Sequence, residues 1–151
     1  MRRAVAYLAI LIVAGACAMG EILADYGDPV DMRPTDLVGT WVSGKSRAIV
    51  FDEDGTFAAS DLPYEVFDEF VPNGFDPADQ LDGSGTWSLE TPIGASHGRK
   101  SHVHLRFDRL ADTSAALGGP DLSALRQDEG VVYLVFFYVG SGGNGWCAYH
   151  K

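Results

Sequence analysis

Cysteine is scarce in this chain, which contains only Cys17 and Cys147. An oxidising compartment would permit a disulfide between them. If Cys17 is removed or modified, however, Cys147 has no partner, and we expect it to be a small buried strand residue. A reactive thiol needs an activating neighbour, and residues 146–149, Trp-Cys-Ala-Tyr, supply none.

Basic residues are also few. Lysine and arginine number 11 against 21 aspartates and glutamates, which gives a formal net charge of -10. Such an acidic chain is poorly suited to bind nucleic acid, and it argues against anionic lipid as a partner of the folded domain.

A hydrophobic run long enough to span a membrane is missing. Arg2 and Arg3 precede an apolar run over residues 4–19, and Glu21 follows it. A spanning helix needs about 20 predominantly apolar residues. The positively charged start and the shorter apolar run are typical of a secretory signal peptide, which we assign to residues 1–16.

The end of this signal has two interpretations. Residues 14–17, Ala-Gly-Ala-Cys, resemble the lipobox of bacterial lipoproteins, which implies that Cys17 is acylated and becomes the new N-terminus. Residues 17–36 would then form a lipidated tether, and the acyl chains, such as palmitate, would hold the protein on the extracytoplasmic side of the cell membrane. The alternative is cleavage before Met19, which gives a secreted protein.

The remaining residues, 37–151, predict one β-rich domain. Short β-prone runs separated by glycine-rich or acidic turns occupy residues 37–42, 47–51, 56–60, 83–89, 103–107, 131–139 and 146–150. Residues 111–129 carry no clear pattern. We therefore predict an all-β fold, an antiparallel barrel of seven to eight strands, with a β-sandwich as the alternative.

One short helical insertion is expected around residues 63–70. Pro63 suits a first helical turn, and Tyr64, Phe67 and Phe70 recur at helical spacing. The insertion is either a plug at one end of the barrel or a mobile lid over a ligand cavity.

Three short motifs carry a family resemblance. Residues 39–41 (Gly-Thr-Trp), 54–57 (Asp-Gly-Thr-Phe) and 85–87 (Gly-Thr-Trp) begin or join predicted strands. In this pattern the chain resembles small bacterial lipocalin-like, or calycin-type, envelope lipoproteins. The resemblance implies a barrel in which an arginine after the last long strand covers the opening tryptophan, Trp41. This chain has no arginine there, and Lys151 is the only late candidate.

Few residues suggest chemistry. His102 and His104 share one face of a predicted strand, so they could chelate zinc or copper with a third ligand, or simply face solvent. Residues 52–55, Asp-Glu-Asp-Gly, fit a hairpin turn better than a calcium loop. Asp76, Asp79 and Asp82 could act as general acid and base only if the fold placed them across a cleft.

Together these features predict an exported, lipid-anchored β-barrel of the cell envelope without a cofactor. Its expected role is non-catalytic binding of a small apolar ligand or an envelope protein. The alternatives are a filled barrel that acts as a structural or inhibitor-type interaction module, and a metal-dependent envelope enzyme that uses His102 and His104.

Overall fold

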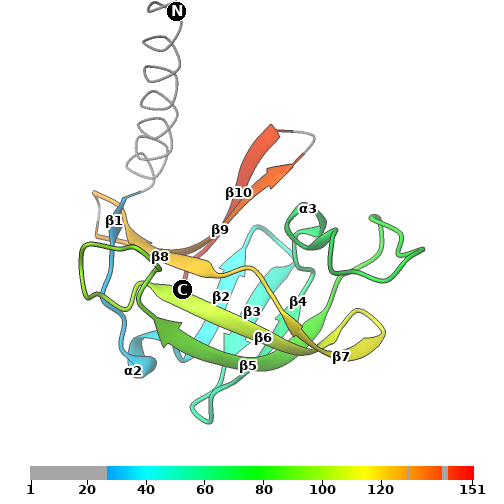
Figure 1. Cartoon of the computed structure of the whole chain (residues 1–151), viewed down its shortest axis with the longest axis horizontal. Coiled ribbons are helices and arrows are strands. Elements are labelled where there is room, and N and C mark those ends of the chain that lie inside the picture. Colours follow the sequence, from blue (N-terminus) through cyan, green and yellow to red (C-terminus); the bar gives the residue numbers. More distant parts are fainter. Residues whose placement is uncertain (1–26, 129, 141–142) are drawn as a thin grey trace, which may run out of the picture.

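The computed structural model describes residues 27–128, 130–140 and 143–151, and these form an antiparallel β-barrel (Figure 1). The predicted signal peptide and Cys17 lie outside the described residues. The main sheet has the order β10-β9-β8-β6-β5-β4-β3-β2. Its strands are β2 (Gly39–Ser43), β3 (Arg47–Phe51), β4 (Thr56–Ser60), β5 (Gly83–Glu90), β6 (His102–Leu110), β8 (Leu122–Arg126), β9 (Val132–Gly140) and β10 (Gly143–Tyr149).

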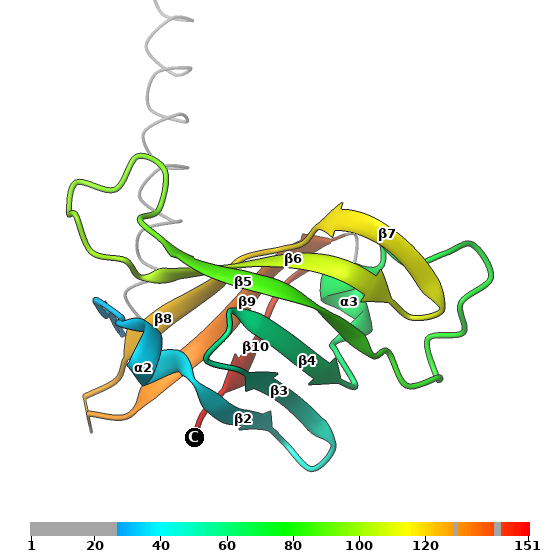
Figure 2. The ribbon, with the colours of Figure 1, turned by 90° about the horizontal axis from the view of Figure 1, so that it is seen from below.

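Two further strands extend this sheet at its sides. The short β1 (Asp28–Pro29) pairs with β8, and β7 (Thr113–Gly118) pairs with β6. The helices α2 (Pro34–Leu37) and α3 (Tyr64–Phe67) lie at opposite ends of the barrel (Figure 2). The predicted all-β barrel with a short helical insertion is thus confirmed for the described residues.

The sheet curls until its first and last main strands meet. Val42 of β2 donates to the carbonyl of His150 at 2.8 Å, and the His150 amide donates back to Val42 at 3.0 Å. This bridge brings β2 beside β10 and nearly closes the barrel. Closure satisfies backbone groups at the two strand edges, which would otherwise remain open to pairing.

Strand alternation fixes which side chains enter the interior. In β6, Val103, Leu105 and Phe107 are at most 1% exposed, whereas His102 and His104 lie on the outer side. The same period-two pattern buries Ile49 and Phe51 in β3. These inward apolar residues form the core of the protein.

A close backbone approach shapes the contact between β5 and β6. The register of this pair shifts between Ser84 and Gly85. A Cβ atom on Gly85 would lie 1.9 Å from the carbonyl oxygen of Arg106, so only glycine fits there. The shift is a β-bulge, which increases the local twist and helps to curl the sheet.

Helix α3 plugs one end of the barrel. Its Phe67 is fully buried, with its ring centroid 5.4 Å from those of both Phe107 and Phe136. The predicted stripe of three aromatic residues is only partly correct, because the helix is a single turn. Phe70 remains 37% exposed and Tyr64 stacks on Phe75 instead.

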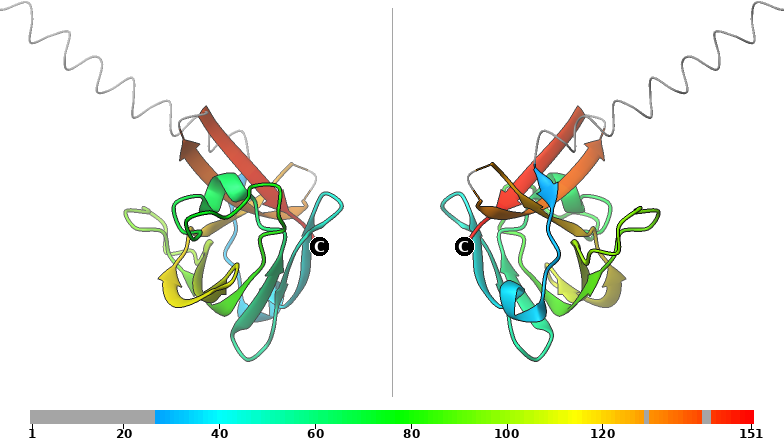
Figure 3. Two further views of the ribbon diagram at one scale, coloured as in Figure 1. Left: turned by 90° about the vertical axis from the view of Figure 1, so that its right-hand side faces the viewer. Right: turned by 90° about the vertical axis from the view of Figure 1, so that its left-hand side faces the viewer.

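The domain begins earlier than its predicted boundary at residue 37. Strand β1 and most of α2 fall within the segment expected to be a flexible tether, and Met32 is buried in the core. Figure 3 views the two ends of the barrel, with α3 nearer in its left panel and α2 in its right panel. Residues from 27 onward therefore belong to the fold.

Among the described residues, no helix has the length and hydrophobicity needed to cross a membrane.

Candidate functional site

A pocket of about 460 Å³ lies on the outer face of the barrel, under the loop between β5 and β6. One wall is the turn at residues 92–95, and the other is β1 with the end of β8. This loop, β1 and the β8–β9 turn gather at one end of the molecule in Figures 1 and 2. Apolar contributions to the walls come from Pro29, Pro92, Ile93 and Leu125.

The floor of the pocket is polar. His102 of β6 and Ser123 of β8 are register partners, so both side chains project from the same outer face. The Ser123 hydroxyl lies 3.3 Å from Nε2 of His102. Asp28, His97 and Ser101 complete the polar lining.

Asp121, just before β8, joins the two histidines of β6. Its Oδ1 lies 2.7 Å from Nδ1 of His104, and its Oδ2 lies 3.8 Å from Nδ1 of His102. The sequence prediction that His102 and His104 share a strand face is confirmed. Both histidines face the Asp121 carboxylate, which lies beside them because β8 pairs with β6.

Burial lowers the pKa of the His102 imidazole below its ordinary value of 6.5. The charges of Asp121 and Glu90 oppose this shift, whereas His97 adds to it. At neutral pH the His102 ring is therefore uncharged, with one nitrogen able to donate and the other able to accept a hydrogen bond. The floor offers neutral hydrogen-bonding groups rather than a fixed positive charge.

The contacts of His102 resemble those of the histidine in a serine hydrolase triad: one ring nitrogen faces the hydroxyl of Ser123, and the other faces the carboxylate of Asp121. The orientation is incomplete, however, because the short bond of Asp121 goes to His104 and not to His102. No group of three or more histidine, cysteine or acidic side chains suited to hold a metal ion occurs in the described part of the chain.

A second pocket, of about 410 Å³, lies at the α3 end of the molecule. Three of its carboxylates, Asp76, Asp79 and Asp82, are those singled out in the sequence, and Asp112 and Arg109 join them. They line the same open, acidic hollow.

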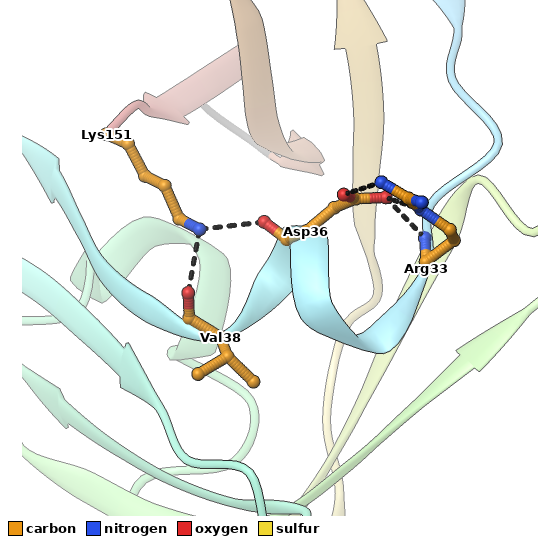
Figure 4. Close-up of polar contacts among 4 residues, drawn as sticks. All are labelled: Arg33, Asp36, Val38 and Lys151. Atoms are coloured by element: carbon orange, nitrogen blue, oxygen red, sulfur yellow. Dashed lines mark hydrogen bonds and ion pairs between the residues drawn. The ribbon is translucent and has the colours of Figure 1, made fainter.

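The opposite end of the barrel is closed by Trp41 and Lys151. The indole Nε1 donates to the carbonyl of Leu37 at 2.7 Å, and Nζ of Lys151 lies 5.2 Å from the ring centroid. Figure 4 shows Nζ donating to the carbonyls of Asp36 and Val38, at 2.8 and 2.7 Å. Lys151 therefore covers Trp41 in place of the missing arginine, and it also caps the end of α2.

Arg33 fixes the start of the same helix. Its guanidinium and backbone amide both donate to the Asp36 carboxylate, which also appears in Figure 4. The hydrogen bond from the Arg33 side chain is the main reason that the pKa of Asp36 falls to about 2. A pocket of about 660 Å³ adjoins this end and includes Trp41, Arg126 and Lys151 in its lining.

Cys147 is buried in β10, as its sequence context predicted, and no described residue forms a disulfide with it. Its sulfur lies 3.5 Å from the Ser43 hydroxyl and 3.8 Å from a guanidinium nitrogen of Arg47. Burial raises the pKa of the neighbouring Tyr149 hydroxyl far above its ordinary value. That hydroxyl has no hydrogen-bond partner among the described residues.

The acidic turn at residues 52–55 is a β-hairpin, as predicted. Asp54 accepts hydrogen bonds from both the amide and the hydroxyl of Thr56, and Gly55 has a φ of 85°. The lipid attachment predicted at Cys17 lies outside the described residues. Asp121 and Ser123 were missed because no local motif marks them.

Comparison with known proteins gave no match, either to family models or among curated proteins and solved structures.

Proposed function

We propose that this chain is an exported, lipid-anchored β-barrel protein of the cell envelope that binds a small, partly apolar ligand without transforming it. The signal-like residues 1–16 and the lipobox ending at Cys17 support the export and the anchor. The motifs around Trp41 and Trp87, together with Lys151 over Trp41, support kinship with lipocalin-like envelope lipoproteins.

The proposal depends chiefly on one observation: the pocket beside His102 lies outside the barrel, whereas aromatic side chains pack the interior. Inside the barrel, the rings of Phe57, Phe67, Phe107 and Phe136 pack edge to face, with centroids 5.1 to 5.4 Å apart. Side chains fill this part of the interior. The pocket beside His102 lies outside the barrel and has apolar walls with a polar floor, which suits a ligand.

The lining defines the class of ligand. Pro92, Ile93 and Leu125 favour contact with an apolar group, whereas the neutral His102 and the Ser123 hydroxyl favour a hydroxyl, carbonyl or amide. A volume of about 460 Å³ fits a small molecule. We therefore expect an amphipathic ligand with few polar atoms, and the Asp28 carboxylate in the lining disfavours an anionic one.

Native mass spectrometry of protein extracted from the envelope tests the ligand. The expected result is a bound small molecule that is lost when Ala95→Trp fills the pocket and retained in Ala58→Trp, which adds the same bulk to an exposed site on β4. A ligand that persists in Ala95→Trp would contradict the location. An unliganded protein would favour the alternative of a filled barrel that acts as an interaction module.

The anchor has a separate test. The N-terminal peptide of the mature protein should carry acyl groups on Cys17, and Cys17→Ser should release the protein from the membrane fraction. A mature chain that begins at Met19 would instead identify a secreted protein.

A further inference from the structure

We propose that the end of the barrel formed by β1, the β5–β6 loop and the β8–β9 turn docks on the lipid bilayer, with Ile93 in the interface. This inference rests on the proposed lipid anchor at Cys17. It adds a defined orientation, which the anchor alone does not impose.

The path of the chain brings this end to the membrane. Nine residues, 18–26, separate Cys17 from Gly27. A fully extended segment of that length spans at most about 30 Å. Gly27 lines the same pocket as Ile93, so the tether reaches the fold beside this loop.

Ile93 is the chemical feature that fits a bilayer. At 106% relative exposure it is the most exposed large hydrophobic side chain of the described residues. It lies in a turn closed by the hydrogen bond from the Ala95 amide to the Pro92 carbonyl. Val131, 40% exposed, belongs to the β8–β9 turn at the same end.

The loop that carries Ile93 is fastened to β1 and the residues after it. Arg99 donates to the carbonyl of Pro29 at 3.3 Å, and the Lys100 amide donates to Asp31 at 2.8 Å. The Met32 amide in turn donates to the Lys100 carbonyl at 3.1 Å. The loop and the start of the fold therefore move as one unit, and tension in the tether would draw Ile93 toward the membrane.

The uneven distribution of charge supports the same orientation. At the docking end, Arg99, Lys100 and Arg126 partly offset Asp28, Asp31, Glu90 and Asp128. At the α3 end, by contrast, acidic residues prevail, namely Glu65, Asp68, Glu69, Asp76, Asp79, Asp82 and Asp112. Anionic lipid therefore repels the α3 end more strongly than the end beside the tether, which favours an orientation with the tether end toward the bilayer.

Tethering lets a small contact suffice. An exposed isoleucine on a free protein adds too little affinity to hold it on a membrane, but a short tether turns docking into an intramolecular step at high effective concentration. The contact of the loop with the bilayer then needs only to make the docked orientation more favourable than the other orientations of the tethered domain. We expect it to enter the headgroup region without the domain crossing the bilayer.

Spin labels on the acylated full-length mature protein in vesicles test the orientation. A label at Ile93→Cys should show much greater accessibility to oxygen, relative to a water-soluble nickel chelate, than a label at Asn73→Cys in the acidic end. A label at Val131→Cys should change from the membrane-like to the aqueous pattern when Ile93→Glu is added.

The outcomes separate this inference from the anchor on which it rests. Protein that co-sediments with vesicles but carries an equally aqueous label at residues 93 and 73 overturns docking and leaves the anchor in place. Protein that does not co-sediment at all contradicts the anchor, and docking fails with it. A membrane-like label at residue 131 that is insensitive to Ile93→Glu would also overturn the role of Ile93.

Discussion

Lys151 lies over the indole of Trp41, with Nζ 5.2 Å from the ring centroid. The same ammonium group donates to two carbonyls at the end of α2. One side chain thus joins the last residues of the barrel to the segment that enters its first main strand. The aliphatic stem and the charge contribute separately, so substitutions can distinguish them.

Lys151→Ala should destabilise the domain by about 1–2 kcal/mol, because it removes a cation–π contact and two charge-assisted hydrogen bonds at a partly solvated site. Urea unfolding monitored by tryptophan fluorescence measures this loss. Lys151→Arg should recover most of it. Lys45→Ala, in the exposed turn between β2 and β3, is the control and should change stability by no more than about 0.5 kcal/mol. Equal effects of the two alanine substitutions would show that the contact contributes nothing.

Phe67→Ala should destabilise the domain by about 3–5 kcal/mol, since it removes a fully buried ring and leaves a cavity between Phe107 and Phe136. Phe70→Ala is the matched control in the same segment. Its ring is 37% exposed, so we expect a loss of about 1 kcal/mol or less. Denaturant midpoints give both values, and similar losses would mean that α3 does not plug the barrel.

The Asp36 carboxyl should titrate with a pKa of about 2 in the folded protein, below the unfolded value of about 3.9. Its interaction with Arg33 therefore stabilises the fold above about pH 4, and this contribution disappears as the pH falls toward 2. Carboxyl chemical shifts in NMR follow the titration directly. Arg33→Ala should raise the pKa of Asp36, whereas Arg99→Ala, which does not contact it, should leave the midpoint unchanged.

His102 should titrate below its ordinary pKa of 6.5 because burial disfavours its charged form. Its folding contribution is then present above about pH 6.5 and is lost as the pH falls through the folded pKa, since the unfolded state gains its proton first. Imidazole shifts in NMR report the midpoint. Asp121→Asn should lower it further, because the Asp121 charge raises it. A rise would contradict the assigned arrangement.

The sequence correctly predicted those strands in which apolar and polar side chains alternate regularly. Residues 103–107 alternate apolar and polar side chains, and they fall within β6. Residues 113–126 gave no such signal, because small residues such as Ala124 carry little hydrophobic information by themselves. Their strands exist because β7 pairs with β6 and β8 pairs with both β6 and β9, and these contacts are set by the whole sheet.

The candidate pocket could likewise be predicted only as far as a single strand determines it. The sequence placed His102 and His104 on one face, since that follows from the period of a single strand. It could not predict the approach of Asp121 and Ser123 to these histidines. That approach depends on the direct pairing of β8 with β6, although β7 separates the two strands in the sequence. The helical insertion was predicted as a stripe of three aromatic residues, but α3 has room for one turn and buries only Phe67 of the three.

The bridge between Val42 and His150 also bears on the order of folding. Most strands pair with a neighbour in sequence, so the meander can assemble progressively from its N-terminal strands. The ring cannot close until residue 150 is in place. Until then the chain is an open sheet with free edges on β2 and β10, the form most prone to pair with other unfinished chains. The interval before closure is therefore the period when the folding chain most needs protection from aggregation.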